Sequence, residues 1–215
     1  MNSFKGGLYK RLFKRPMDFI LSLIAIIVLS PVFFIVAVLV RTKLGSPILF
    51  KQERPGLNEK VFSMYKFRSM TDKKDENGEI LPDSIRLTKF GRLLRSTSLD
   101  ELPGLFNILK GEMSIIGPRP LLVRYLPYYT ENERKRHSVR PGLSGLAQVN
   151  GRNTLGWGER FAIDIEYVRN VSLLLDLKII MKTIIKALKR EGITIVDISP
   201  LEDLDVERRN SFENR

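Results

Sequence analysis

Residues 19–40 read FILSLIAIIVLSPVFFIVAVLV, a run of 22 residues without a charged side chain. A straight helix of this length would extend about 33 Å, enough to cross the roughly 30 Å hydrocarbon core of a bilayer. Pro31 interrupts the run, where it removes a backbone hydrogen bond and bends the helix, and Ser30 can satisfy the carbonyl group that is freed. The run therefore predicts a membrane helix with a bend in its middle.

The charges around this run favour a helix that does not cross the membrane. Basic residues flank both ends, whereas a spanning helix usually has its excess of Lys and Arg on one side. The halves 19–29 and 32–40 are too short to span singly, so a bent helix could enter one leaflet and return to the same anionic surface. We expect residues 1–43 to form such a re-entrant helix, and a single spanning helix is the alternative.

Composition narrows the function further. The 215 residues include no cysteine and one histidine, which excludes disulfides, thiol catalysis and sites built from several Cys or His ligands. Lys and Arg outnumber Asp and Glu by 36 to 24, which indicates anionic partners such as nucleic acid, phosphorylated small molecules or an acidic membrane surface. Within residues 1–43, seven residues are basic and Asp18 is the single acid.

The rest of the chain predicts one α+β domain, mainly helical, over residues 44–195. Two β-prone runs, 48–51 and 61–67, enclose a Pro-Gly turn and predict a small β-hairpin. A charged loop and a short helix with a basic face, over 85–95, should follow. Residues 196–215 form a polar C-terminal tail, and we expect its last part, EDLDVERRNSFENR at residues 202–215, to fray.

Residues 173–190, LLLDLKIIMKTIIKALKR, predict an amphipathic helix. Its basic residues recur every four positions while apolar residues fill the other faces. Such a helix can lie at a lipid interface. A core helix with a solvated stripe of lysines is an equally good interpretation.

Two adjacent carboxylates, Asp100 and Glu101, begin the segment SLDELPGLFNILKG at residues 98–111. Its apolar spacing predicts a helix that starts near Asp100, because Pro103 is tolerated only in the first turn, and that ends at Gly111. Acids are common at helix starts as caps, and Ser98 with Glu101 matches a capping box. The same carboxylates could bind Mg²⁺, and an ionised Asp can attack phosphorus, so both interpretations remain open.

Cations in rigid surroundings favour the second interpretation, because phosphoryl chemistry needs positive charge to neutralise its transition state. Arg119 lies between two prolines, and two further arginines lie in turn signals. The candidate phosphate ligands are Lys66, Arg95, Arg119, Arg140 and Arg152. The sequence has no P-loop or dinucleotide-binding motif, and an Asp-x-Asp, Asp203 and Asp205, lies in the polar tail. We expect His137 to be an interfacial basic residue.

The motifs RPGLNEKVFSMYKFRSM, SLDELPGLFNILKGEMSIIGPRPLL, RHSVRPGLSGLAQVNGRN and FAIDIEYVRNVSLLLDLKII follow the hydrophobic run in this order. Over about residues 8–192 the chain resembles the bacterial sugar transferases, the small monotopic polyprenyl-phosphate phosphoglycosyl transferases. Within them it is most similar to enzymes for N-acetylated aminosugar (bacillosamine-type) phosphates. The departures are mild: Gly104 stands for the usual Gln, Leu146 for the usual Trp, and Glu112 for a common Asp.

The resemblance implies a re-entrant helix broken at Ser30 and Pro31, and a catalytic domain on the cytoplasmic face of the bacterial inner membrane. It implies a two-step transfer of a sugar phosphate from a UDP-sugar to undecaprenyl phosphate, with release of UMP. Asp100 would be the nucleophile and a Mg²⁺ ligand, with Glu101 as ligand or base. Arg119 and Arg152 would hold nucleotide or phosphate, with Lys66, Arg95 and Arg140 in supporting roles.

Two other functions compete with this expectation. The first is a membrane-tethered nucleic-acid binder, but no nucleic-acid-binding signature is found, so we expect no nucleic-acid partner. The second is a non-catalytic partner in glycan export, which would need no nucleophile. The sequence leaves open which sugar is transferred and in which glycan pathway, and whether the chain forms a homodimer.

Overall fold

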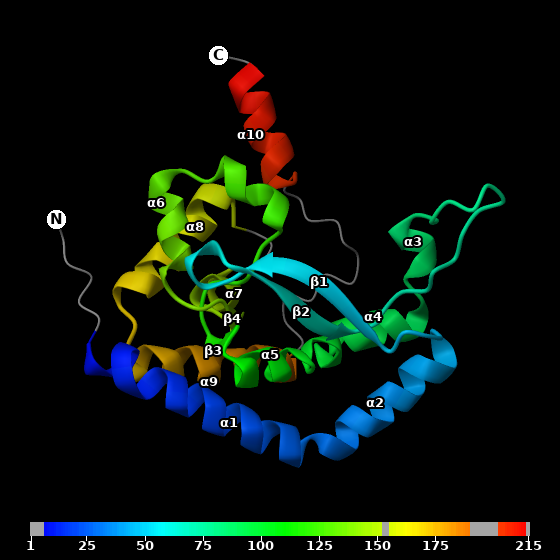
Figure 1. Cartoon of the computed structure of the whole chain (residues 1–215), viewed down its shortest axis with the longest axis horizontal. Coiled ribbons are helices and arrows are strands. Elements are labelled where there is room, and N and C mark those ends of the chain that lie inside the picture. Colours follow the sequence, from blue (N-terminus) through cyan, green and yellow to red (C-terminus); the bar gives the residue numbers. More distant parts are fainter. Residues whose placement is uncertain (1–6, 152–154, 190–201, 214–215) are drawn as a thin grey trace.

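The structure is a computed structural model that describes residues 7–151, 155–189 and 202–213. It is mainly helical, with two short two-stranded sheets at its centre (Figure 1). The helices are α1 (Lys14–Val28), α2 (Ser30–Lys43), α3 (Asp83–Arg86), α4 (Lys89–Ser96), α5 (Gly104–Lys110), α6 (Glu131–Arg134), α7 (Leu146–Asn150), α8 (Trp157–Arg169), α9 (Leu173–Lys189) and α10 (Leu204–Glu213). The strands are β1 (Leu49–Pro55), β2 (Val61–Phe67), β3 (Ser114–Ile116) and β4 (Gly142–Ser144).

The apolar run forms two helices with a sharp bend between them. A π-helical turn and α1 run to Val28, α2 begins at Ser30, and the two parts are bent by 64°. Pro31 has no N–H to offer Ile27, and the Ser30 hydroxyl donates to that carbonyl instead, at 2.8 Å. Within the described residues no single helix is long and apolar enough to cross a membrane, whereas this bent pair passes the same criteria together.

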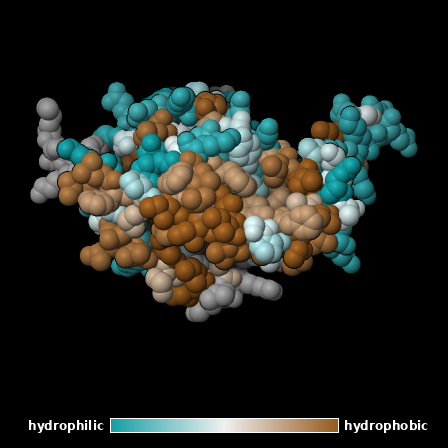
Figure 2. Space-filling model, turned by 60° about the horizontal axis from the view of Figure 1, so that its bottom comes forward, coloured by the Kyte–Doolittle hydropathy of each residue, from teal (hydrophilic) through white to brown (hydrophobic). Residues whose placement is uncertain are grey.

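The outer faces of α1, α2 and α9 share an apolar surface. Helices α1 and α2 form the lower edge of the molecule, with α9 and α5 above them (Figure 1). Seen from below, hydrophobic side chains cover much of this face (Figure 2). In α9 both interpretations of the sequence hold in part: Ile179 is fully buried, while Leu174 and Met181 are 80% and 57% exposed.

Polar side chains anchor α1 to the rest of the chain. The buried Asp18 carboxylate accepts hydrogen bonds from the Ser114 hydroxyl (2.7 Å) and the Ile115 N–H (3.1 Å) in β3. Lys14 forms a buried ion pair with Asp176 at the start of α9, at 2.6 Å. Helix α1 is therefore fixed to the strand that leads to Arg119.

The predicted hairpin is confirmed, and the structure adds a second pair of strands. β1 and β2 are antiparallel, with Leu49 opposite Phe67 and Pro55 opposite Val61. β3 and β4 pair in parallel, with Ser114 opposite Gly142. The short helix expected over 85–95 is divided into α3 and α4, because Leu87 is extended and Thr88 caps α4 by accepting from the Gly91 N–H.

The segment that carries the two adjacent acids differs from the expected continuous helix. Leu99–Glu101 form a 3₁₀ turn, and α5 begins after Pro103, at Gly104. Ser98 is left-handed, with φ 55°, and its side chain makes no cap hydrogen bond, so the capping-box match in the sequence does not form a cap in the structure. Gly111 ends the helix with φ 83°, as predicted.

The expectation that the C-terminal tail frays is wrong for its described part. Residues 204–213 form α10, and the side chain of Leu204 is fully buried against an aromatic cluster. The Tyr125 hydroxyl donates to Asp203 at 2.6 Å, and the Trp157 indole donates to the Glu202 carbonyl at 2.9 Å. Asp203 therefore has a structural role in docking this helix.

Candidate active site

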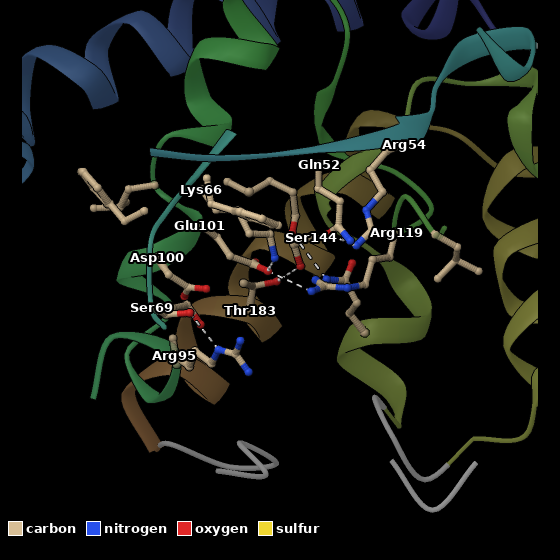
Figure 3. A pocket seen from close by; sticks show the side chains of 18 of the residues that line it. Gln52, Arg54, Lys66, Ser69, Arg95, Asp100, Glu101, Arg119, Ser144 and Thr183 are labelled. Atoms are coloured by element: carbon tan, nitrogen blue, oxygen red, sulfur yellow. Dashed lines mark hydrogen bonds and ion pairs between the residues drawn. The ribbon is translucent and has the colours of Figure 1, made fainter. Parts of the chain in front are cut away.

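A cavity of about 1050 Å³ lies between the hairpin, the turn that carries the two acids, α8 and α9. Its polar wall contains most of the cations selected from the sequence (Figure 3). Apolar side chains, among them Leu143, Ile180 and Ile184, line another part of it. Because α9 contributes to both the cavity and the apolar surface, the cavity lies close to that surface.

Glu101 is the centre of an ion-pair network in this cavity. Its Oε1 accepts from Lys66 Nζ at 2.9 Å and from Arg119 Nη2 at 2.8 Å. Burial alone would raise the pKa of this carboxyl group, but the charges of Arg119 and Lys66 outweigh burial and hold the pKa well below its usual range. Glu101 is therefore an anion throughout the physiological pH range.

Asp100 has the opposite environment. Its side chain lies in the 3₁₀ turn, 8% exposed, and no described residue donates a hydrogen bond to its carboxylate. Burial, followed by the negative charge of Glu101, raises the pKa of Asp100 to about 6, although Lys66, Arg95 and Arg119 lower it in part. A carboxylate with this pKa is mostly ionised at neutral pH and a better base than an ordinary Asp.

The backbone fixes the cations that surround the acids. Lys66 is held by its place in β2, and Asn107 of α5 fixes this strand against the helix. The fully buried side-chain amide of Asn107 accepts from the Tyr65 N–H at 3.0 Å and donates to the Ser63 carbonyl at 2.8 Å. Arg95 projects from α4 and donates to the Ser69 hydroxyl at 3.0 Å.

A second buried ion pair supports Arg119. The Arg136 guanidinium, 2% exposed, pairs with Asp164 of α8 at 2.7 Å. The same guanidinium donates to the Arg119 carbonyl at 2.7 Å. Because Pro118 and Pro120 restrict the backbone on both sides, this hydrogen bond fixes the direction in which the Arg119 side chain leaves the chain.

The structure thus brings together five of the candidate residues selected from the sequence: Asp100, Glu101, Lys66, Arg95 and Arg119. It places Arg140 elsewhere, at the far end of α5, where Arg140 Nε donates to the Gly111 carbonyl at 2.7 Å. Arg152 lies outside the described residues.

Several cations that line the cavity were not among the candidates selected from the sequence; Arg54 on β1 and Arg160 on α8 are two of them. A signal for Arg54 was present, since it precedes Pro-Gly as Arg140 does. Arg160 lies four residues before the buried Asp164, on a helix whose charge pattern alone does not show which face lines a cavity.

The expectation for His137 is wrong. Its side chain is buried, and both ring nitrogens lack hydrogen-bond partners among the described residues. Burial, then the charges of Arg136 and Arg134, lowers the pKa of His137 to about 3. His137 is therefore a neutral core residue packed edge-on against Tyr129, not a basic residue at an interface.

The cavity can offer oxygen ligands to a divalent cation, but few of them. Within the described part of the chain no cluster of three or more Asp, Glu, His or Cys side chains is arranged to hold a metal ion. Asp100 and Glu101 are the adjacent carboxylates among the described lining residues; Glu101 Oε1 already accepts from two cations, and Asp164, which also lines the cavity, is paired with Arg136. This donor set fits Mg²⁺, which is commonly bound by one or two carboxylates together with phosphate oxygens of a substrate.

A buried carboxylate beside several cations is suited to phosphoryl transfer. The Asp100 carboxylate has the charge and the raised basicity of a nucleophile, and the guanidinium and ammonium groups can neutralise phosphate oxygens. The Arg119–Glu101 and Lys66–Glu101 contacts hold these donors in place before a ligand arrives.

Comparisons with known proteins agree with this chemistry. The family model described as "Bacterial sugar transferase" matches residues 9–190. Sugar transferase EpsL of Bacillus subtilis is 51% identical over 84% of this chain and 89% of its own. UDP-glucose:undecaprenyl-phosphate glucose-1-phosphate transferase of Klebsiella pneumoniae is 43% identical over 81% of this chain. Undecaprenyl-phosphate galactose phosphotransferase of Salmonella typhimurium is 37% identical over 85%. The alignments cover only 40% and 42% of these last two relatives.

Proposed function

The chain belongs to the bacterial sugar transferase family, and from this premise we propose that it transfers a sugar 1-phosphate from a UDP-sugar to undecaprenyl phosphate, releasing UMP. It is a phosphoglycosyl transferase, and its product is the first lipid-linked intermediate of a glycan. The observation that carries the proposal is the pairing of a buried Asp100 with a Glu101 that is fixed by Lys66 and Arg119.

The proposed first step uses Asp100 as the nucleophile. One carboxylate oxygen attacks the β-phosphorus of the UDP-sugar, and the bond from that phosphorus to the bridging oxygen breaks. UMP leaves with the bridging oxygen and its electron pair, and the sugar phosphate stays on Asp100 as an acyl phosphate. Lys66, Arg95 and Arg119 neutralise the charge on the phosphate oxygens.

The proposed second step restores the enzyme. A phosphate oxygen of undecaprenyl phosphate attacks the same phosphorus, and the bond to the Asp100 oxygen breaks. The carboxylate is regenerated and undecaprenyl-diphospho-sugar leaves. Glu101 stays ionised in both steps and keeps Arg119 and Lys66 oriented.

Mg²⁺ is the proposed cofactor, with Asp100 and Glu101 as its protein ligands. When bound, it would supply positive charge for the phosphate oxygens of the donor. The chain's own groups would still perform the positioning, because the Arg119 and Lys66 contacts are formed by the protein alone.

We propose that the bent pair α1–α2 dips into one leaflet of the bacterial cytoplasmic membrane and leaves the cavity on the cytoplasmic side. The 64° bend, the basic flanks and the exposed apolar side chains of α1, α2 and α9 support this topology. An acceptor whose tail stays in the bilayer could then present its phosphate to the cavity without leaving the lipid.

For the donor we propose an N-acetylated aminosugar, on the sequence resemblance alone. Relatives of similar identity are named for glucose and for galactose, so the sugar must be determined by experiment. The test is UMP release by detergent-purified protein given undecaprenyl phosphate, Mg²⁺ and a panel of UDP-glucose, UDP-galactose and N-acetylated UDP-aminosugars. The proposal requires release from at least one donor, dependent on Asp100, and Asp100→Asn is the control. Release that is equal in this variant would contradict it.

A further inference from the structure

One part of the cavity brings several arginine side chains together. Arg54 on β1 and Arg160 on α8 both line the cavity, and each interacts electrostatically with Arg119 and with Tyr125. They therefore face the same region. Among the described residues, Glu101 is already engaged by Arg119 and Asp164 by Arg136, and no described carboxylate forms an ion pair with Arg54.

The Arg54 side chain is held in place, but one of its hydrogen-bond donors has no acceptor among the described residues. Its Nη2 donates to the Gln52 side-chain oxygen at 2.6 Å, which orients the guanidinium. Its Nε is buried without an acceptor among the described residues. Burial, followed by the charge of Arg119, lowers the pKa of Arg54 to about 10. An anion in this region would accept a hydrogen bond from the buried Arg54 Nε–H and reduce the electrostatic repulsion between Arg54 and Arg119.

Arg160 adds a second oriented guanidinium. Its carbon Cζ lies 4.6 Å from the centre of the Trp157 ring, an arrangement that fixes the plane of a guanidinium. Burial lowers the pKa of Arg160; Asp164 raises it in part, and Arg119 and Arg136 lower it further. Like Arg54, it is therefore a partly buried cation beside other cations.

The place of these residues suits a water-soluble ligand. In Figure 3, Arg54 and Gln52 lie on one side of Glu101, and Asp100 and Arg95 lie on the other. The N-terminal end of α8 and the Pro55 end of β1 lie away from α1 and α2 in Figure 1. This group of arginines thus lies on the side of the cavity that is remote from the apolar surface formed by α1 and α2.

We propose that Arg54 and Arg160, together with Arg119, form a phosphate subsite that binds the phosphate of the leaving nucleotide. The inference rests on the proposed function. In a UDP-sugar, one bridging oxygen separates the phosphorus beside Asp100 from this second phosphate. When that oxygen leaves with its electron pair, negative charge develops on the nucleotide phosphate, and the guanidinium groups of the subsite stabilise it.

Titration calorimetry with UMP on the full chain in detergent tests the subsite without turnover. We expect Arg54→Gln and Arg160→Gln each to bind UMP about 10 to 100 times more weakly than wild type, since each loses a charge-assisted hydrogen bond. The control is Lys51→Gln, an exposed lysine on the same strand and outside the cavity lining, which should bind UMP as wild type does. Added salt should weaken UMP binding more steeply in wild type than in either variant.

Three results would overturn the subsite: no UMP binding by wild type, unchanged UMP affinity in both variants, or a raised KM for undecaprenyl phosphate with unchanged UMP affinity. The last would assign the arginines to the acceptor's phosphate. If Arg54→Gln fails to fold, Arg54→Lys keeps the charge but loses the planar fork, and it should bind UMP with intermediate affinity.

Failure of the proposed function would look different. Wild-type protein that binds UMP but releases none from any UDP-sugar would refute the transferase and leave the subsite standing. Protein that turns over normally while both arginine variants bind UMP like wild type would refute the subsite and leave the transferase standing.

Discussion

Asp100 and Glu101 are adjacent in the chain, yet their carboxyl groups have opposite electrostatic environments. Burial and the charge of its neighbour raise the pKa of Asp100 to about 6, whereas Arg119 and Lys66 hold the pKa of Glu101 far below the usual range. Two titratable groups with pKa values pushed apart are typical of catalytic pairs with divided roles. Here Asp100 would react, and Glu101 would hold the cations.

The first prediction concerns pH. Asp100 must be ionised to attack phosphorus, and its raised pKa means that it gains a proton as the pH falls through about 6. We expect the rate of UMP release at low donor concentration to fall about tenfold per pH unit below 6 and to level off above 7. A pH–rate profile measures this. A rate that begins to fall only near pH 4 would show that Asp100 has an ordinary pKa in the free enzyme.

The second prediction concerns the Glu101 network. Glu101→Gln leaves Arg119 and Lys66 facing a neutral group, so we expect the free energy of unfolding to fall by about 2 kcal/mol, less than for a fully buried pair because the Glu101 side chain is 18% exposed. We expect UMP release to fall about 100-fold as the cations lose their positions.

Thermal unfolding in detergent and a UMP assay check both effects. The control is Glu53→Gln, which makes the same charge change at an exposed position on β1, outside the cavity lining. In a double-mutant cycle with Arg119→Ala, the double variant should lose less stability than the sum of the losses in the two single variants. Full additivity would show that the Glu101–Arg119 ion pair contributes nothing.

The third prediction concerns the anchor of α1. Asp18→Ala removes the acceptor for the Ser114 hydroxyl and the Ile115 N–H, and we expect a loss of about 2 kcal/mol in stability. Ser22→Ala is the matched control: this side chain is also buried in α1, but among the described residues its hydroxyl donates to the Phe19 carbonyl of its own helix alone. Equal unfolding temperatures of the two variants would contradict the anchoring role.

The fourth prediction concerns membrane topology. Because the chain has no cysteine, Lys10→Cys and Lys43→Cys each introduce a single thiol, one at either end of the bent pair. If the pair is re-entrant, a membrane-impermeant maleimide should label both thiols from the same side of sealed vesicles. Lys135→Cys, exposed in the catalytic domain, marks the cytoplasmic side. Labelling of the two flanks from opposite sides would establish a spanning helix.

Local sequence signals predicted the features that depend on neighbouring residues. The bend near Pro31, the β1–β2 hairpin and the left-handed Gly111 each follow from residues a few positions apart. The start of α5 was misplaced because Pro103 begins the helix only after a 3₁₀ turn, which apolar spacing does not reveal.

The sequence did not predict contacts between segments that lie far apart in the chain. β3 and β4 have three residues each and meet across 25 intervening positions, too little pattern to predict a parallel pair. Similarly, α10 is polar in sequence and was expected to fray, but Leu204 and the Asp203–Tyr125 hydrogen bond dock it onto a surface formed far along the chain. The same contrast holds for the cations of the cavity. The prolines on either side of Arg119 indicate its role in the sequence, whereas only the tertiary structure places Arg160 at the cavity.

The central claim is that Asp100 carries the sugar phosphate. Purified protein incubated with Mg²⁺ and a UDP-sugar, without lipid acceptor, should gain the mass of one phosphosugar in intact-mass spectrometry, and Asp100→Asn should gain none. Added undecaprenyl phosphate should then remove the adduct. If wild type acquires no adduct while undecaprenyl phosphate still supports UMP release, the transfer is a direct displacement and Asp100 is not the nucleophile.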